Sequence, residues 1–147
     1  MLADFQQALA DMVASPPLCR EVRANPACLS ERYRLTDLEV RRLANMAKQQ
    51  GMACNCTLYR ANRLAPLALN LHDLCLALGD QLTPLVDEFW KFYPEAGVNF
   101  LVECQNFCDF LISKHERGLV LSDEAWLAFG REHRDLELRL LAIRTFL

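Results

Sequence analysis

The chain has 147 residues, of which 52% are hydrophobic, and its 16 basic and 19 acidic side chains give a net charge of −3. This length and composition predict a folded protein with a substantial core and exclude a disordered or fibrous one. Because the two signs of charge are mixed along the sequence, we expect no broad cationic surface and no binding to nucleic acid.

The N-terminal sequence and the cysteine content indicate a cytoplasmic protein. Residues 1–13 contain acidic side chains and no basic cluster, unlike a secretory signal. Asn70, His72 and Asp73 interrupt the most apolar stretch, so we expect no membrane span. The seven cysteines are an odd number, which favours reduced thiols over a disulfide framework.

The first third of the chain reads as a series of short helices. Apolar residues at helical spacing predict a helix over 2–13, and the following Ser-Pro-Pro ends it. We expect a short helix over about 17–23 and a single turn near 29–33. Thr36 and Glu39 then form a capping box.

The capping box predicts a helix that runs to about Gln50, with Gly51 just beyond its end. Residues three and four apart on a helix share a face. The expected apolar face consists of Leu38, Leu43, Met46 and Ala47.

The middle of the chain is the most apolar part. A helix is expected from about Cys56, and Pro66 either kinks it or makes it restart. Residues 67–78 are apolar on nearly every side, which predicts a central helix covered by its neighbours, and Gly79 ends it.

Three further elements complete the prediction. Thr83 and Pro84 are typical of a helix start, and a second helix is expected over about 98–114. Residues 118–121 are expected to form a short extended link before Ser122, which caps a last helix. The predicted fold is thus an all-α, single-domain bundle of about six to seven helices, with residues 1–53 as an N-terminal lobe packed on a core bundle of 54–147.

No standard catalytic motif is present. Cys104 and Cys108 share a helical face, where they fill a core or present two thiols, and His72 and Cys75 are either a buried pair or a base and nucleophile. The spacing of the cysteines does not match a zinc site. We expect no catalytic residue, metal or cofactor in this chain.

The polar group Tyr59, Arg60, Asn62 and Arg63 stands at the start of the apolar region. Two interpretations stay open. Arg63 either satisfies helix-end carbonyls or a carboxylate such as Asp87 or Glu88 in a structural latch, or the group forms a patch that binds a partner or a peptide.

Two other segments are candidates for contact with a partner or peptide. Four aromatic residues crowd positions 89–93, and they cannot all point inward, so Trp90 or Tyr93 is expected to face a partner. Leu119, Val120 and Leu121 form a candidate strand edge for an extended peptide.

Four segments of the sequence are informative together. They are Tyr59-Arg60-Ala61-Asn62-Arg63, Leu78-Gly79, Phe89-x-x-x-Tyr93-Pro94 and Phe107-x-x-Phe110-Leu111. They resemble a known group of proteins, the helical companions of multinuclear non-haem iron oxidases, which include TglI-like, MbnC-like and HvfC/BufC-like proteins. The length of the chain is most similar to the TglI-like members.

The resemblance implies a heterodimer with an iron-dependent barrel subunit that oxidises a cysteine of a carrier or precursor peptide. The companion binds the barrel and helps to hold the peptide, and the iron belongs to the partner subunit. In the TglI-like case the reaction excises the β-carbon of a carboxy-terminal cysteine during 3-thiaglutamate biosynthesis.

Three alternatives remain. Asn25-Pro26 followed by Tyr33-x-Leu35-Thr36-x-x-Glu39 resembles the small helical subunit of LigAB-type extradiol dioxygenases. A capped helix with Arg41 and Arg42 is also compatible with a small DNA-binding regulator. A thiol redox protein that uses Cys54 and Cys56 is the third.

Overall fold

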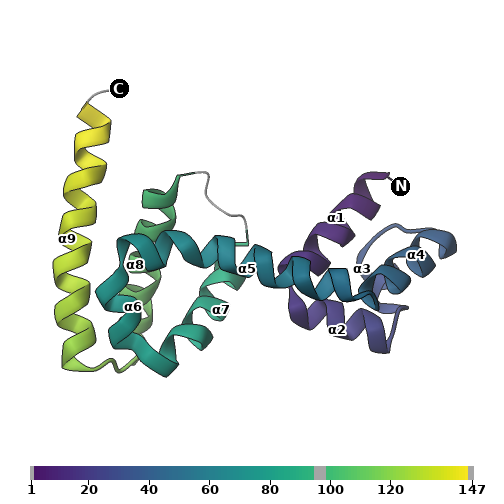
Figure 1. Cartoon of the computed structure of the whole chain (residues 1–147), viewed down its shortest axis with the longest axis horizontal. Helices are drawn as coiled ribbons and strands as arrows, with labels where there is room; N and C mark the ends of the chain where they lie inside the picture. Colours follow the sequence, from purple (N-terminus) through teal and green to yellow (C-terminus); the bar gives the residue numbers. More distant parts are fainter. Residues whose placement is uncertain (1, 95–98, 146–147) are drawn as a thin grey trace. The chain divides into compact units, whose positions relative to one another are not determined.

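The computed structural model of the chain describes residues 2–94 and 99–145. These residues form helices α1 to α9 and a 3-10 turn, η1, and they include no β-strand. In Figure 1 the helices are coloured in chain order, from α1 in purple to α9 in yellow. The predicted all-α class is confirmed.

The chain divides into two compact units, one that ends at Asn62 and one that begins at Arg63. The division falls inside α5 (Gln50–Asn70), which therefore contributes residues to both units. It lies nine residues beyond the expected end of the N-terminal lobe at residue 53. The helix expected from about Cys56 begins at Gln50.

Unit 1 consists of short helices joined by tight connections. Apart from the first part of α5, it contains α1 (Leu2–Ala14), α2 (Pro16–Ala24), α3 (Cys28–Arg32) and α4 (Asp37–Ala47). The predicted helices near 2–13, 17–23 and 29–33 are therefore present.

Side-chain caps mark the starts of α2 and α4 in unit 1. The Ser15 hydroxyl accepts a hydrogen bond from the Leu18 amide at 3.3 Å. At α4, the Thr36 hydroxyl accepts from the Glu39 amide at 3.3 Å, while the Glu39 carboxylate accepts from the Thr36 amide at 2.8 Å. The predicted capping box is confirmed.

The predicted end of α4 is wrong. The helix ends at Ala47, and Gly51 belongs to the first turn of α5. Arg23 from α2 donates to the Ala47 carbonyl, so a side chain from another helix satisfies this helix end. Leu38, expected on the buried face, is 50% exposed.

The core of unit 1 is built from small, aliphatic and sulfur-containing side chains. Cys56 donates to the carbonyl of Met12 at 3.5 Å, and this contact links α5 to α1. The buried residues are Ala8, Met12, Leu18, Cys19, Val22, Cys28, Leu29, Leu43, Ala44, Ala47, Met52 and Cys56.

Pro66 neither stops nor restarts α5, and the helix continues to Asn70. The carbonyl of Pro66 accepts hydrogen bonds from Asn70 Nδ2 at 2.8 Å and from Cys104 Sγ at 3.2 Å. The break occurs at Leu71 instead, and a separate helix, α6 (His72–Leu78), follows. The predicted single helix over 67–78 is thus two helices.

The rest of unit 2 contains η1 (Gly79–Gln81), α7 (Leu82–Phe92), α8 (Phe100–Glu116) and α9 (Asp123–Thr145). The expected start at Thr83 is two residues late, because Gln81 is the cap residue of α7. Asn99 caps α8 by accepting from the Leu101 amide at 2.9 Å, while the predicted start at Val98 lies outside the described residues. Ser122 caps α9 as predicted, accepting from the Ala125 amide at 3.1 Å.

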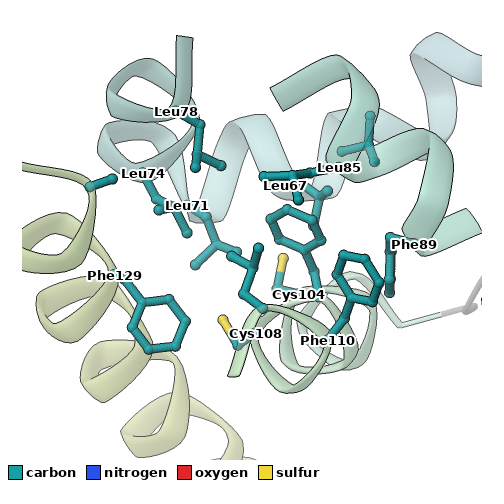
Figure 2. Close-up of a cluster of buried hydrophobic side chains, with 14 of the residues drawn as sticks. Leu67, Leu71, Leu74, Leu78, Leu85, Phe89, Cys104, Cys108, Phe110 and Phe129 are labelled. Atoms are coloured by element: carbon teal, nitrogen blue, oxygen red, sulfur yellow. The ribbon is translucent and has the colours of Figure 1, made fainter. Parts of the chain in front are cut away.

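Aromatic and leucine side chains from α5 to α9 form the core of unit 2 (Figure 2). The ring of Phe89 from α7 lies 5.2 Å from that of Phe107 and 5.7 Å from that of Phe110, both from α8. Phe129 joins from α9. The broken helix places Leu71, which is fully buried, against this cluster.

A carboxylate from α9 holds the start of α6. The two oxygens of Glu132 accept from the amides of Asp73 and Leu74, each at 2.9 Å. Because the first amides of a helix have no partner within it and carry a partial positive charge, a carboxylate stabilises this end. Arg131 adds an exposed ion pair with Asp73 at 2.7 Å.

Candidate functional site

Arg63 is the centre of a buried polar site in unit 2. Its Nη2 atom donates to the carbonyl of Tyr93 and to Oε1 of Glu103, both at 2.8 Å, and Nη1 donates to the carbonyl of Pro94 at 3.3 Å. Tyr93 closes the last turn of α7 and Glu103 lies in the first turn of α8. One guanidinium therefore ties together three helices of the unit.

The pair is buried from solvent. The side chains of Arg63 and Glu103 are each 3% exposed. The guanidinium carbon also lies 5.4 Å from the ring centre of Trp90, within the range of a cation–π contact. A buried ion pair is favourable only when further hydrogen bonds compensate for lost hydration, and the two carbonyls provide them.

The geometry favours the latch interpretation for Arg63, with a different carboxylate from those expected. Glu88 pairs with Lys114 at 2.7 Å, and Glu103 takes the place proposed for Asp87 or Glu88. The sequence itself indicates that Glu103 is buried, because Glu103 shares a helical face with the apolar residue Phe107. A carboxylate on a core face requires a charged partner.

The other residues of the polar group lie on the unit 1 side of the division. Tyr59 and Arg60 are half-buried and Asn62 is exposed. Of these four residues, Arg63 is the one that is buried, and it pairs with Glu103.

Two of the four aromatic residues at positions 89–93, Phe92 and Tyr93, line a pocket. Phe89 is buried, Trp90 and Tyr93 are half-buried, and Phe92 is 60% exposed. Phe92 therefore offers more surface to a partner than either residue expected to do so. The pocket measures about 350 Å³ and is lined by Phe92, Tyr93, Asp109, Phe110, Ser113, Lys114 and Arg117.

The link between α8 and α9 already uses several of its backbone groups. The Leu119 amide donates to the Lys114 carbonyl at 2.9 Å, and the Leu119 carbonyl lies 3.1 Å from a ring nitrogen of His115. Gln81 donates to the Val120 carbonyl at 3.3 Å. Val120 is 79% exposed and Leu121 is buried. A peptide that pairs with this edge would have to compete with these contacts.

The buried cysteines behave as core residues with poorly acidic thiols. Burial raises the pKa of Cys75 to about 11, with Glu132 adding to the effect, and raises the pKa of Cys104 to about 12. Burial also raises the pKa values of Cys108 and Cys56. A redox or nucleophilic thiol requires a lowered pKa, so these shifts oppose such roles for Cys56 and Cys75.

The described residues contain neither a candidate metal site nor a helix suited to a membrane. Within residues 2–94 and 99–145, no group of three or more His, Cys, Asp or Glu side chains is placed to hold a metal ion. No helix in the same ranges is long and apolar enough to cross a membrane.

Comparison with known proteins gave no match to any protein-family model, to any curated protein or to any solved structure.

Proposed function

We propose that the chain is a noncatalytic partner subunit of an iron-dependent, peptide-modifying oxidase. In this role it binds the catalytic barrel subunit and helps to present a carrier peptide whose cysteine is oxidised. The iron and the oxidative chemistry belong to the partner, and this chain supplies binding surfaces.

The observation that carries the proposal is the convergence of the segments that resemble the companion proteins. Arg63 binds the carbonyls of Tyr93 and Pro94, and so joins the first of these segments to the third. Phe107 and Phe110 pack on Phe89, which joins the third to the fourth. Arg63 and the third and fourth segments therefore pack together in unit 2, and this packing supports the proposal.

A surface suited to a protein partner lies on α9. Leu127, Leu138 and Leu141 are 75%, 62% and 63% exposed. Leu138 follows Leu127 by about three helical turns, and Leu141 follows it by about four. The three leucines therefore lie on one face of α9, opposite the buried Phe129 and Leu136. We call these leucines, with Gly130 between them, the outer face of α9.

Gly130 has no role within the described part of the chain. It lies inside α9, is exposed, and an added Cβ would meet nothing within 4 Å. Glycine in the interior of a helix costs about 1 kcal/mol relative to alanine. A close approach by the backbone or side chains of the partner explains why this cost is tolerated.

Co-expression with a barrel-type iron oxidase that modifies a peptide cysteine tests the proposal. We expect the two chains to co-purify as a heterodimer, and the iron to remain with the barrel subunit. Oxidation of the peptide should require both chains. Full activity of the barrel alone, or no co-purification with any such oxidase, would contradict the proposal.

Variants of the outer face test the surface. Leu138→Glu is expected to weaken the heterodimer at least tenfold, because it places a charge in an apolar contact. Leu38→Glu, at an exposed leucine of α4, is the matched control and should leave association unchanged. Gly130→Ala should raise the thermal stability of the isolated chain and weaken the heterodimer, a combination that a purely structural role does not produce.

The division of the chain also favours a second candidate of the same kind. The pattern that resembles the small subunit of LigAB-type dioxygenases lies in unit 1, whereas the companion pattern lies mostly in unit 2. Both place the chain beside an iron enzyme. Co-purification with an extradiol dioxygenase subunit in place of the peptide oxidase would select the second candidate.

A further inference from the structure

The pocket beside the Arg63 site has an aromatic floor. The ring centres of Phe92 and Phe110 lie 6.0 Å apart, with 48° between the ring planes. Phe110 is 6% exposed and belongs to the core, whereas Phe92 is 60% exposed at the rim. A volume of about 350 Å³ lies within the range of small-ligand sites. The pocket therefore suits one large apolar side chain.

The polar groups of the pocket lie along one side of α8. Asp109, Ser113 and Arg117 follow one another at intervals of four residues and so lie above one another on the helix. Gln105 donates to Asp109 at 2.9 Å. Lys114 donates to both oxygens of Glu88, at 2.7 and 2.9 Å. The charged groups of Asp109 and Lys114 therefore already have hydrogen-bonding partners.

Arg117 is the cation that remains available. Its side chain is exposed and, among residues 2–94 and 99–145, makes no ion pair or hydrogen bond. It lines the pocket together with Phe92 and Phe110. Guanidinium groups bind carboxylates through two parallel hydrogen bonds, so the charge of Arg117 complements a carboxylate.

We propose that this pocket holds a peptide residue with a large apolar side chain that lies directly beside a carboxylate. The side chain rests on Phe92 and Phe110, and the carboxylate pairs with Arg117. This inference rests on the proposed function and extends it, because it names the part of the carrier peptide that this chain holds.

N-acetyl-L-phenylalanine is a minimal probe, since it carries the ring and the carboxylate in one residue. Titration into the 15N-labelled chain, followed by NMR, should shift the amides of the pocket residues with a dissociation constant on the order of 1 mM, as expected for so small a ligand. N-acetyl-L-phenylalanine amide, without the carboxylate, should bind at least fivefold more weakly. N-acetyl-L-alanine should bind more weakly still.

Two variants separate the contributions of charge and ring. Arg117→Gln should abolish the preference for the acid over the amide, and Phe92→Ala should weaken both ligands. Both side chains are exposed, so the fold should persist, which the unchanged spectrum outside the pocket verifies. Arg144→Gln, at another exposed arginine of unit 2, is the matched control and should change neither affinity.

Several outcomes overturn the assignment. These are no shifts at 10-fold the expected dissociation constant, shifts outside the pocket, equal affinity for acid and amide, or an equal effect of Arg144→Gln. The titration needs no partner subunit, so its failure is distinct from a failure to form the heterodimer.

Discussion

The two units are held together by different kinds of interaction. Unit 1 has a core of aliphatic, alanine and sulfur-containing side chains, and two of its helices, α2 and α4, begin at side-chain caps. Unit 2 has a core rich in phenylalanine and contains a buried ion pair between α5 and α8. Both units contain local caps and contacts between distant residues, but the buried ion pair belongs to unit 2, whereas the capping box belongs to unit 1.

This difference determines how each unit should respond to mutation. Losing a helix cap costs about 1 kcal/mol, because water can replace part of the lost hydrogen bond. Losing one member of a buried ion pair leaves a charge without hydration or partner, which costs more. Unit 2 should therefore be the more sensitive to a single polar substitution.

The largest effect is expected for Arg63→Met. It leaves the Glu103 carboxylate buried without its cation and removes the donor to the Tyr93 and Pro94 carbonyls. We expect unit 2 to lose about 3–5 kcal/mol of stability. Both tryptophans, Trp90 and Trp126, belong to unit 2, so urea unfolding followed by tryptophan fluorescence measures this loss.

The double variant Arg63→Met with Glu103→Leu is the control. It removes both charges and should recover a large part of the lost stability. Alkylation of the buried thiols Cys19 and Cys28 reports on unit 1 in the same samples and should be slow in both variants. Equal stability of the single and double variants would show that the charge pair is not the cause.

A smaller effect is expected at Tyr33 in unit 1, whose hydroxyl donates to Asp11 at 2.7 Å. Burial, followed by this hydrogen bond, raises the pKa of Tyr33 from 10.0 to about 12. The contribution of Tyr33 to stability is therefore complete below pH 10 and is lost as the pH rises towards 12. Tyr33→Phe should cost about 1.5 kcal/mol at neutral pH.

Thermal unfolding followed by far-ultraviolet circular dichroism, between pH 8 and 11, measures this dependence. The native chain should lose stability relative to Tyr33→Phe at the upper end of the range. The tryptophan signal of unit 2 provides the comparison. A difference between the two proteins that is the same at every pH would contradict the role of the ionised form.

The sequence was sufficient where structure depends on neighbouring residues. Thr36 with Glu39, and Ser122, correctly marked helix starts, because a cap and its amide lie within three residues of each other. The all-α class followed from the spacing of apolar residues. The same reasoning failed at Gly51, because α4 ends at Ala47, whose carbonyl is bound by Arg23, 24 residues earlier.

Sequence reasoning was weaker where a contact spans many residues. It identified Arg63 but not its partner Glu103, which lies 40 residues away. It left open whether Pro66 kinks the helix or makes it restart, and it missed the break at Leu71, where Glu132 from α9 binds the first amides of α6. The pocket was also missed, because only the pairing of α7 with α8 brings its side chains together.

The smallest effect is expected at the cap of α4. Thr36→Ala removes the acceptor for the Glu39 amide and should cost unit 1 about 1 kcal/mol, whereas Thr36→Ser should keep the bond.

Hydrogen bonds from the Thr36 amide and hydroxyl lower the pKa of Glu39 below its ordinary value of 4.5. The stabilising hydrogen bond from the Thr36 amide to the Glu39 carboxylate is thus present above pH 4.5, and it is lost as the pH falls through the lowered pKa of Glu39. The difference in stability between the native chain and Thr36→Ala, measured by thermal unfolding, should therefore be smaller in acid. A difference that is the same at every pH would show that the Thr36 hydroxyl acts without Glu39.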